Sequence, residues 1–136
     1  MLRFRQSEFI SLLAEFDNWV DRFNFLIEQS DRLPVNCPPE LQKHRIEFCR
    51  SNTCFRAWIE NDELRVDGWS NAPVQRGIIT SIIDIFDHLP VCEFKDFDPD
   101  ADIYFHEQSG LIDNLTPLRA DGLREMIRRI LTVISQ

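Results

Sequence analysis

The sequence of 136 residues lacks several features that would point to a partner or a location. No apolar run is long enough to span a bilayer, and the N-terminus soon turns acidic, without the continuous apolar core of a signal peptide. The net charge is −8, and lysine and arginine form no stripe or patch, which argues against nucleic acid as a partner. We therefore expect a cytoplasmic protein that binds neither a membrane nor nucleic acid.

Glycine-rich loops of the kinds that cradle phosphate are also missing. The sequence has four cysteines, and the irregular spacing of Cys37, Cys49, Cys54 and Cys92 is not typical of a disulfide framework, so a reducing compartment would keep them as thiols. With His44, the first three of these cysteines could hold zinc or an iron–sulfur cluster. The tight Cys-x-x-Cys pair that usually marks such a site is absent.

The hydrophobic content of the sequence is sufficient for one core. Hydrophobic residues make up 43% of the chain and aromatic residues 11%, while the 28% of charged residues and the ordinary glycine and proline content argue against disorder. The length is that of one domain, so we expect a single domain over residues 1–136.

Apolar periodicity predicts the elements of the first half of the chain. Helical spacing over residues 7–29 indicates a helix in two pieces, with a cap at Asp17. Alternation over residues 53–59 and 64–69, joined by a tight turn at 60–63, predicts a β-hairpin. A hairpin is not stable alone, so it needs a helical layer on its apolar face.

Helical spacing returns in the second half. A buried helix is predicted from Pro73 until about Leu89, followed by an acidic surface connection over residues 91–102 and a short helical piece at 103–109. The last helix should begin after Thr116, whose side chain is expected to cap it. Together these elements predict an α+β fold, in which a small antiparallel β-sheet packs against several helices.

Cys49 directly precedes the first predicted strand. It lies between the apolar Phe48 and a polar run, 50–52, that should be loop. A thiol at such a junction can reach solvent or a partner protein while the sheet holds its backbone. The alternative is that Cys49 is a small buried hydrophobe, since reactivity requires exposure and a favourable electrostatic setting.

Three short motifs carry a resemblance to a known family. They are Ile46–Ser51 (IEFCRS), Gly68–Gly77 (GWSNAPVQRG) and Leu115–Leu123 (LTPLRADGL), of which the last is the most specific. With the order of the elements over residues 15–130, they resemble the SufE family of cysteine desulfuration proteins. Members of this family accept sulfur from cysteine desulfurases during iron–sulfur cluster assembly.

The resemblance implies a SufE/IscU-like domain in which Cys49 is the sulfur-accepting thiol. It implies supporting positions at Arg50, Ser51, Asn71 and Arg119. The implied partners are a SufS-like cysteine desulfurase, which carries its own pyridoxal phosphate, and iron–sulfur scaffold proteins. This chain would need no cofactor, and it would act as a monomer or weak dimer that activates the desulfurase without being an enzyme itself.

The two arginines among these positions have two interpretations. Arg50, on the same loop as Cys49, could favour the thiolate, and Arg119 would do so if the last helix begins beside the loop. Either could instead pair with surface carboxylates.

Two positions depart from the family pattern. Phe48 stands where glycine is usual, and Cys54 stands where tryptophan is common. We expect Phe48 to pack into the core and pin the loop, because burying a phenylalanine is worth about 1.5–3 kcal/mol; left outside, it would join the docking surface. The departures favour one alternative, a module that docks to the desulfurase but carries no sulfur. A metal or cluster scaffold that uses Cys37, Cys49 and Cys54 is the third interpretation.

Overall fold

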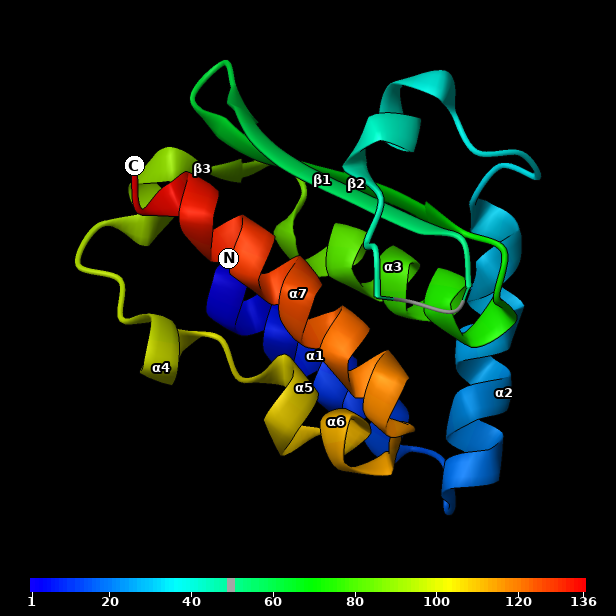
Figure 1. Cartoon of the computed structure of the whole chain (residues 1–136). Coiled ribbons are helices and arrows are strands. Elements are labelled where there is room, and N and C mark those ends of the chain that lie inside the picture. Colours follow the sequence, from blue (N-terminus) through cyan, green and yellow to red (C-terminus); the bar gives the residue numbers. More distant parts are fainter. Residues whose placement is uncertain (49–50) are drawn as a thin grey trace.

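The computed structural model describes residues 1–48 and 51–136 (Figure 1). These residues form a three-stranded antiparallel sheet in the order β1 (Thr53–Glu60), β2 (Glu63–Ser70) and β3 (Leu89–Pro90). On one face, α3 (Pro73–Phe86) packs against β2 and α7 (Pro117–Ile134) packs against β1. The 3-10 segment η2 (Pro39–His44) contacts both long strands from the other face. The architecture confirms the predicted α+β class.

The remaining helices lie below or beside the sheet, and all of them except the helix Pro99–Asp102 contribute residues to the main core. They are α1 (Leu2–Ala14), α2 (Trp19–Gln29), α4 (Pro99–Asp102), α5 (Phe105–Gln108) and α6 (Leu111–Asn114), with 3-10 turns η1 (Ser30–Arg32) and η3 (Val91–Phe94). Phe105 is central to this core, because its ring packs edge-on against Phe9 and Phe86 at centroid distances of 5.7 and 5.8 Å. The core thus joins the N-terminal helix, the central helix and the segment after residue 100.

The hairpin forms as the alternation predicts. Asn61 and Asp62 have positive φ angles of 52° and 60°, a left-handed conformation that Asn and Asp tolerate better than most residues. Phe55 and Leu64 are fully buried on the helical face. The opposite face of the same strands contributes Cys54 to a second, smaller core.

The first helix is longer than its periodicity predicted. It begins at Leu2 rather than at residue 7, because Leu2 and the amide of Gln6 are buried. Gln6 Oε1 accepts hydrogen bonds from the backbone N–H groups of Tyr104 and Phe105, so a polar residue occupies a core-facing position. A hydrophobicity pattern cannot detect such a position.

Two capping predictions were wrong. Asn18, not Asp17, caps α2, since its Oδ1 accepts from the N–H of Asp21 at 2.9 Å. Thr116 does stand at the N-cap of α7 with Pro117 in the first turn, but its side chain makes no capping hydrogen bond. The fixed φ of Pro117 therefore favours the start of this helix without help from the threonine hydroxyl.

The end of α3 also differs from the prediction. Leu89 and Pro90 do not merely stop the helix, because they pair with β2 as the short strand β3. His88, with a φ of 64°, turns the chain back, and its N–H donates to the carbonyl of Leu64 at 2.8 Å. Two residues are too few to show strand alternation in a sequence.

Helices α2 and α3 cross at unusually close range. A Cβ atom on Gly77 would lie 2.1 Å from the carbonyl oxygen of Leu26, so this position admits no side chain. The preceding Arg76 donates hydrogen bonds to the carbonyls of Ser30, Leu33 and Pro34, at the end of α2 and in the segment that follows it. The motif Gly68–Gly77 thus holds the segment that leads from α2 towards the sheet.

Candidate functional site

The loop that precedes β1 is closed at its base by backbone hydrogen bonds. The N–H of Ile46 donates to the carbonyl of Thr53 at 2.8 Å, and Arg45 forms a β-bridge with Cys54. Ile46 is fully buried, so the chain leaves the core at this residue and returns to it at Thr53. The motif Ile46–Ser51 therefore spans a loop whose two ends lie side by side.

A single guanidinium on α7 holds both sides of this base. Arg129 Nη1 donates to the carbonyls of His44 and Phe55, both at 2.7 Å, and Nη2 donates to the carbonyl of Arg45 at 3.1 Å. The same side chain is paired through Nε with Glu125. Nothing in the sequence singles out Arg129, because an arginine in an amphipathic helix is usually a solvated residue.

Asn71 holds the end of the loop, at Asn52, where the chain enters β1. The N–H of Asn52 donates to Asn71 Oδ1 at 3.0 Å, and the N–H of Asn71 donates to the carbonyl of Asn52 at 3.1 Å. Asn71 lies between β2 and α3, so this pair joins the end of the loop to the start of the central helix. Asn71, one of the positions that the family resemblance implies, thus helps to position the loop.

Ser51 begins a chain of hydroxyl groups beneath the loop. Its Oγ lies 2.8 Å from Thr53 Oγ1, which lies 2.9 Å from Ser70 Oγ, and Ser70 Oγ accepts from the N–H of Ala72. Thr53 and Ser70 are fully buried. These contacts satisfy polar groups inside the protein and fix the direction in which the strand begins.

Ser51 and Arg119 line the same cavity, which has a volume of about 630 Å³. Its other lining residues are Ala72, Gln75, Thr116, Pro117 and Leu118. The last helix therefore does begin beside the loop, which was the condition for Arg119 to act there. Gln75 is only 1% exposed, and among residues 1–48 and 51–136 its Oε1 has no hydrogen-bond partner.

Phe48 does not occupy the place that we predicted for it. It is 48% exposed, so the prediction that it packs into the core is wrong. The core position on this side of the loop is filled by Ile46, and the chain turns outwards after it. Phe48 instead lines a shallow cavity of about 490 Å³ with Leu118 and the charged residues Asp121, Arg124, Glu125 and Arg128.

Cys49 and Arg50 lie outside the described residues. The flanking residues Phe48 and Ser51 are described, and each lines a cavity that also includes Leu118. The assignment of sulfur chemistry to Cys49 and of thiolate stabilisation to Arg50 stays a prediction from sequence.

Cys54 is buried on the outer face of the sheet. It is 2% exposed and packs with Leu41, Trp69 and Cys37, whose Sγ lies 4.0 Å from its own. Burial and the neighbouring Cys37 raise the pKa of the Cys54 thiol to about 11. In the part of the chain that the structure describes, no three His, Cys, Asp or Glu side chains gather as a metal site.

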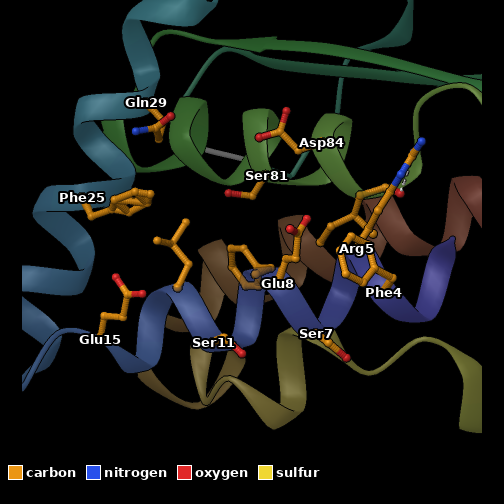
Figure 2. A pocket seen from close by; sticks show the side chains of 13 residues that line it. Phe4, Arg5, Ser7, Glu8, Ser11, Glu15, Phe25, Gln29, Ser81 and Asp84 are labelled. Carbon is orange, nitrogen blue, oxygen red and sulfur yellow. Dashed lines mark hydrogen bonds between the residues drawn. The ribbon is translucent and has the colours of Figure 1, made fainter.

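A further cavity lies away from the loop. It has a volume of about 560 Å³ and is lined by residues of α1, α2 and α3, including Phe4, Phe25 and Ile85 (Figure 2). Glu8 and Asp84 add carboxylates to its lining. It shares no lining residue with the cavity that Ser51 and Arg119 line, so the two are separate features.

The fold of this chain is similar to that of a solved structure. The solution structure of a hypothetical protein from Thermus thermophilus matches 96% of this chain, and 93% of its own chain is covered, with a TM-score of 0.71. The two sequences are 19% identical, so the likeness shows the fold: an α+β domain with a small antiparallel sheet and a helical layer. No helix within residues 1–48 and 51–136 has the length and apolar character needed to cross a membrane.

Sequence comparison identifies the family. The chain belongs to the SufE family, described as the Fe-S metabolism associated domain, whose profile matches residues 7–133. An uncharacterised SufE-like protein of Rhizobium meliloti (strain 1021) is 32% identical over 130 residues, covering 90% of this chain and 89% of the relative. One from Rhizobium etli is 26% identical over 123 residues, covering 84% and 78%. This membership confirms the resemblance and supports a role in iron–sulfur metabolism.

Proposed function

We propose that this protein accepts sulfur on Cys49 from a SufS-like cysteine desulfurase and delivers it to iron–sulfur scaffold proteins. The Cys49 thiolate attacks the outer sulfur of the persulfide on the desulfurase. A new sulfur–sulfur bond forms on Cys49, and the desulfurase cysteine leaves as a thiolate. The pyridoxal phosphate belongs to the partner. In this role the protein works in the cytoplasm as one domain, a monomer or weak dimer, and activates the desulfurase without being an enzyme.

The observation that carries this proposal is the construction of the loop base. Arg129 holds the carbonyls of His44 and Phe55, while Asn71 holds Asn52. A thiol that must enter another protein's active site benefits from a short loop on a fixed support, because the support reduces the number of orientations to be ordered on docking. Family membership supports sulfur acceptance as the chemistry, and the loop base supports the presentation of Cys49 to a partner protein.

Arg119 supports the same role electrostatically. A cation near a cysteine stabilises the thiolate, and the persulfide formed on transfer is also anionic. Arg119 lines a cavity with Ser51, two residues after Cys49 in the sequence. Among residues 1–48 and 51–136, no carboxylate pairs with Arg119, in contrast to Arg124, which pairs with Asp121.

The exposed Phe48 also fits a second candidate function. A half-exposed phenylalanine beside Leu118, ringed by charged residues, has the composition of a protein–protein contact. Such a surface would serve a module that docks to the desulfurase and regulates it without carrying sulfur. Both functions use the same docking surface, and they differ only in the use of Cys49.

Mass spectrometry separates the two functions. The reduced protein is incubated with a SufS-like desulfurase and cysteine, and its mass should rise by one sulfur atom located on Cys49. The Cys49→Ser variant should bind the desulfurase with unchanged affinity but gain no sulfur. Normal loading of Cys49→Ser would refute the assignment of Cys49, while binding of the wild-type protein without any loading would favour the regulatory module.

A further inference from the structure

Two thiols on the outer face of the sheet lie in contact. Cys37 follows η1, and Cys54 is the second residue of β1. Their Sγ atoms are 4.0 Å apart, which is longer than the roughly 2.05 Å of a disulfide bond but close enough for side-chain rotation to bring them together. The irregular cysteine spacing gave no sign of this pair.

The contact is held by the surrounding structure. Trp69, the β2 partner of Cys54, donates its indole N–H to the carbonyl of Pro34 at 2.8 Å. Arg76 donates to the same carbonyl at 3.0 Å and to that of Leu33 at 2.7 Å. The segment that leads into Cys37 is therefore fastened to β2 and α3, while Cys54 is fixed by the sheet.

The two thiols differ in their access to solvent. Cys54 is buried, whereas Cys37 is partly exposed and lines a cavity of about 590 Å³. Arg76 also lines this cavity, and its guanidinium donates to the carbonyls of Ser30, Leu33, Pro34 and Ser70, so it holds the wall of the cavity in place. A reagent that enters here meets Cys37 first, and Cys54 lies directly behind it.

We propose that Cys37 and Cys54 form a reversible dithiol–disulfide couple that exchanges with a low-molecular-weight disulfide of the glutathione type. Cys37 is the attacking thiol and Cys54 is the resolving thiol. This site is separate from the proposed sulfur acceptor, because it uses neither Cys49 nor a persulfide.

The exchange takes two balanced steps. The Cys37 thiolate attacks one sulfur of glutathione disulfide, the disulfide bond breaks, and one glutathione leaves as a thiolate that takes up the proton released by Cys37. Cys54 then loses its proton to solvent and attacks the Cys37 sulfur, so the second glutathione leaves and is protonated. The two protein thiols are oxidised to one disulfide, and one glutathione disulfide is reduced to two glutathione molecules.

Oxidation of Cys37 and Cys54 would act on the loop of the candidate site. The cavity at Cys37 is also lined by Asn52 and Asn71, the pair that holds the loop. A bond between residues 37 and 54 would close a ring that contains the whole of the motif Ile46–Ser51. Such a ring restricts the unfolded chain, so the oxidised protein should unfold at a higher temperature than the reduced protein.

The test uses the full chain and glutathione disulfide. The protein is reduced, freed of reductant, incubated with glutathione disulfide, blocked with N-ethylmaleimide and mapped by peptide mass spectrometry without reduction. The expected product is a peptide pair joined through Cys37 and Cys54. The exposed Cys92 serves as an internal control, because it is a free thiol that should carry glutathione as a mixed disulfide.

Two variants identify the roles of the thiols. In Cys54→Ser, glutathione should remain attached to Cys37, because no resolving thiol is present; Cys54→Ala replaces this variant if the serine prevents folding. In Cys37→Ser, Cys54 should stay unmodified. Glutathione remaining on Cys37 of the wild-type protein to the same extent as in Cys54→Ser, or a disulfide between Cys37 and Cys49, would overturn the proposal.

Discussion

Asn52 and Asn71 hold each other through two hydrogen bonds, one from each backbone N–H, at 3.0 and 3.1 Å. The first uses the side-chain oxygen of Asn71, and the second uses the backbone carbonyl of Asn52. Substitution of Asn71 therefore removes only the first of them. This makes Asn71 a suitable position for measuring how far the loop base affects sulfur transfer.

We expect Asn71→Ala to lower the free energy of unfolding by about 0.5–1.5 kcal/mol, the usual value of one hydrogen bond. It should also slow sulfur loading of Cys49 several-fold, because the end of the loop loses a support. Urea unfolding and the initial rate of mass increase measure the two effects. Asn71→Asp keeps a side-chain acceptor and should recover much of the loss; loading of Asn71→Ala at the wild-type rate would show that this support is not used.

The Arg129 contacts predict a larger effect on stability. Arg129→Met removes donors from three carbonyls in one step, and we expect a loss of about 2–3 kcal/mol in the free energy of unfolding, since hydrogen bonds to charged groups are the stronger ones. Chemical denaturation measures it. Arg128→Met is the matched control, because that side chain is 62% exposed and its ion pair with Glu125 is worth at most about 1 kcal/mol. Equal losses in the two variants would contradict the role of Arg129.

The exposure of Phe48 predicts an effect on binding rather than on folding. Phe48→Ser should weaken the affinity for the desulfurase on the order of tenfold, the result of losing about 1.5 kcal/mol of apolar burial in the complex. Its free energy of unfolding should change little. Ile59→Ser is the control, because Ile59 is similarly exposed but lies near the tip of the hairpin. Calorimetric titration compares the variants, and unchanged affinity of Phe48→Ser would exclude Phe48 from the docking surface.

His106 predicts a loss of stability at mildly acidic pH. Burial lowers the pKa of its imidazole, and Arg124 acts in the same direction, against the opposing effect of Glu107. The folded protein therefore keeps His106 neutral where the unfolded chain already binds a proton, so the free energy of unfolding falls as the pH drops below about 6.5.

This pH dependence can be measured by urea unfolding at a series of pH values. His106→Gln should show a smaller decrease between neutral and mildly acidic pH, because one of the groups responsible is gone. Burial also lowers the pKa of His44, which accounts for part of the remaining decrease. His88→Gln is the control for an exposed histidine. An identical pH dependence in His106→Gln and the wild-type protein would be evidence against this account.

Much of the fold was predictable from local patterns. The hairpin, the two long buried helices and the start of the last helix follow from alternation, helical spacing and the position of Pro117. The errors concern features that depend on distant partners. Gln6 extends the first helix because it binds a segment almost a hundred residues away, and β3 exists because Leu89 finds β2.

The motifs named candidate residues for the site, but they did not show how the site is constructed. Ser51, Asn71 and Arg119 came from motifs, and the structure brings Ser51 and Arg119 to one cavity. Arg129 was missed, since nothing local distinguishes it from Arg128. The burial of Phe48 was predicted from its hydrophobicity, yet Ile46 occupies the available core position.

Gly77 has a consequence for the two thiols. Its missing side chain lets α2 approach α3 so closely that the carbonyl of Leu26 occupies the space of a Cβ atom. The segment that carries Cys37 continues from α2, and Trp69 and Arg76 fasten it to β2 and α3 through the carbonyl of Pro34. A methyl group at position 77 would act as a spacer, moving α2 outwards and drawing Cys37 away from Cys54. A residue that has no side chain is therefore one of the constraints on where Cys37 lies relative to Cys54.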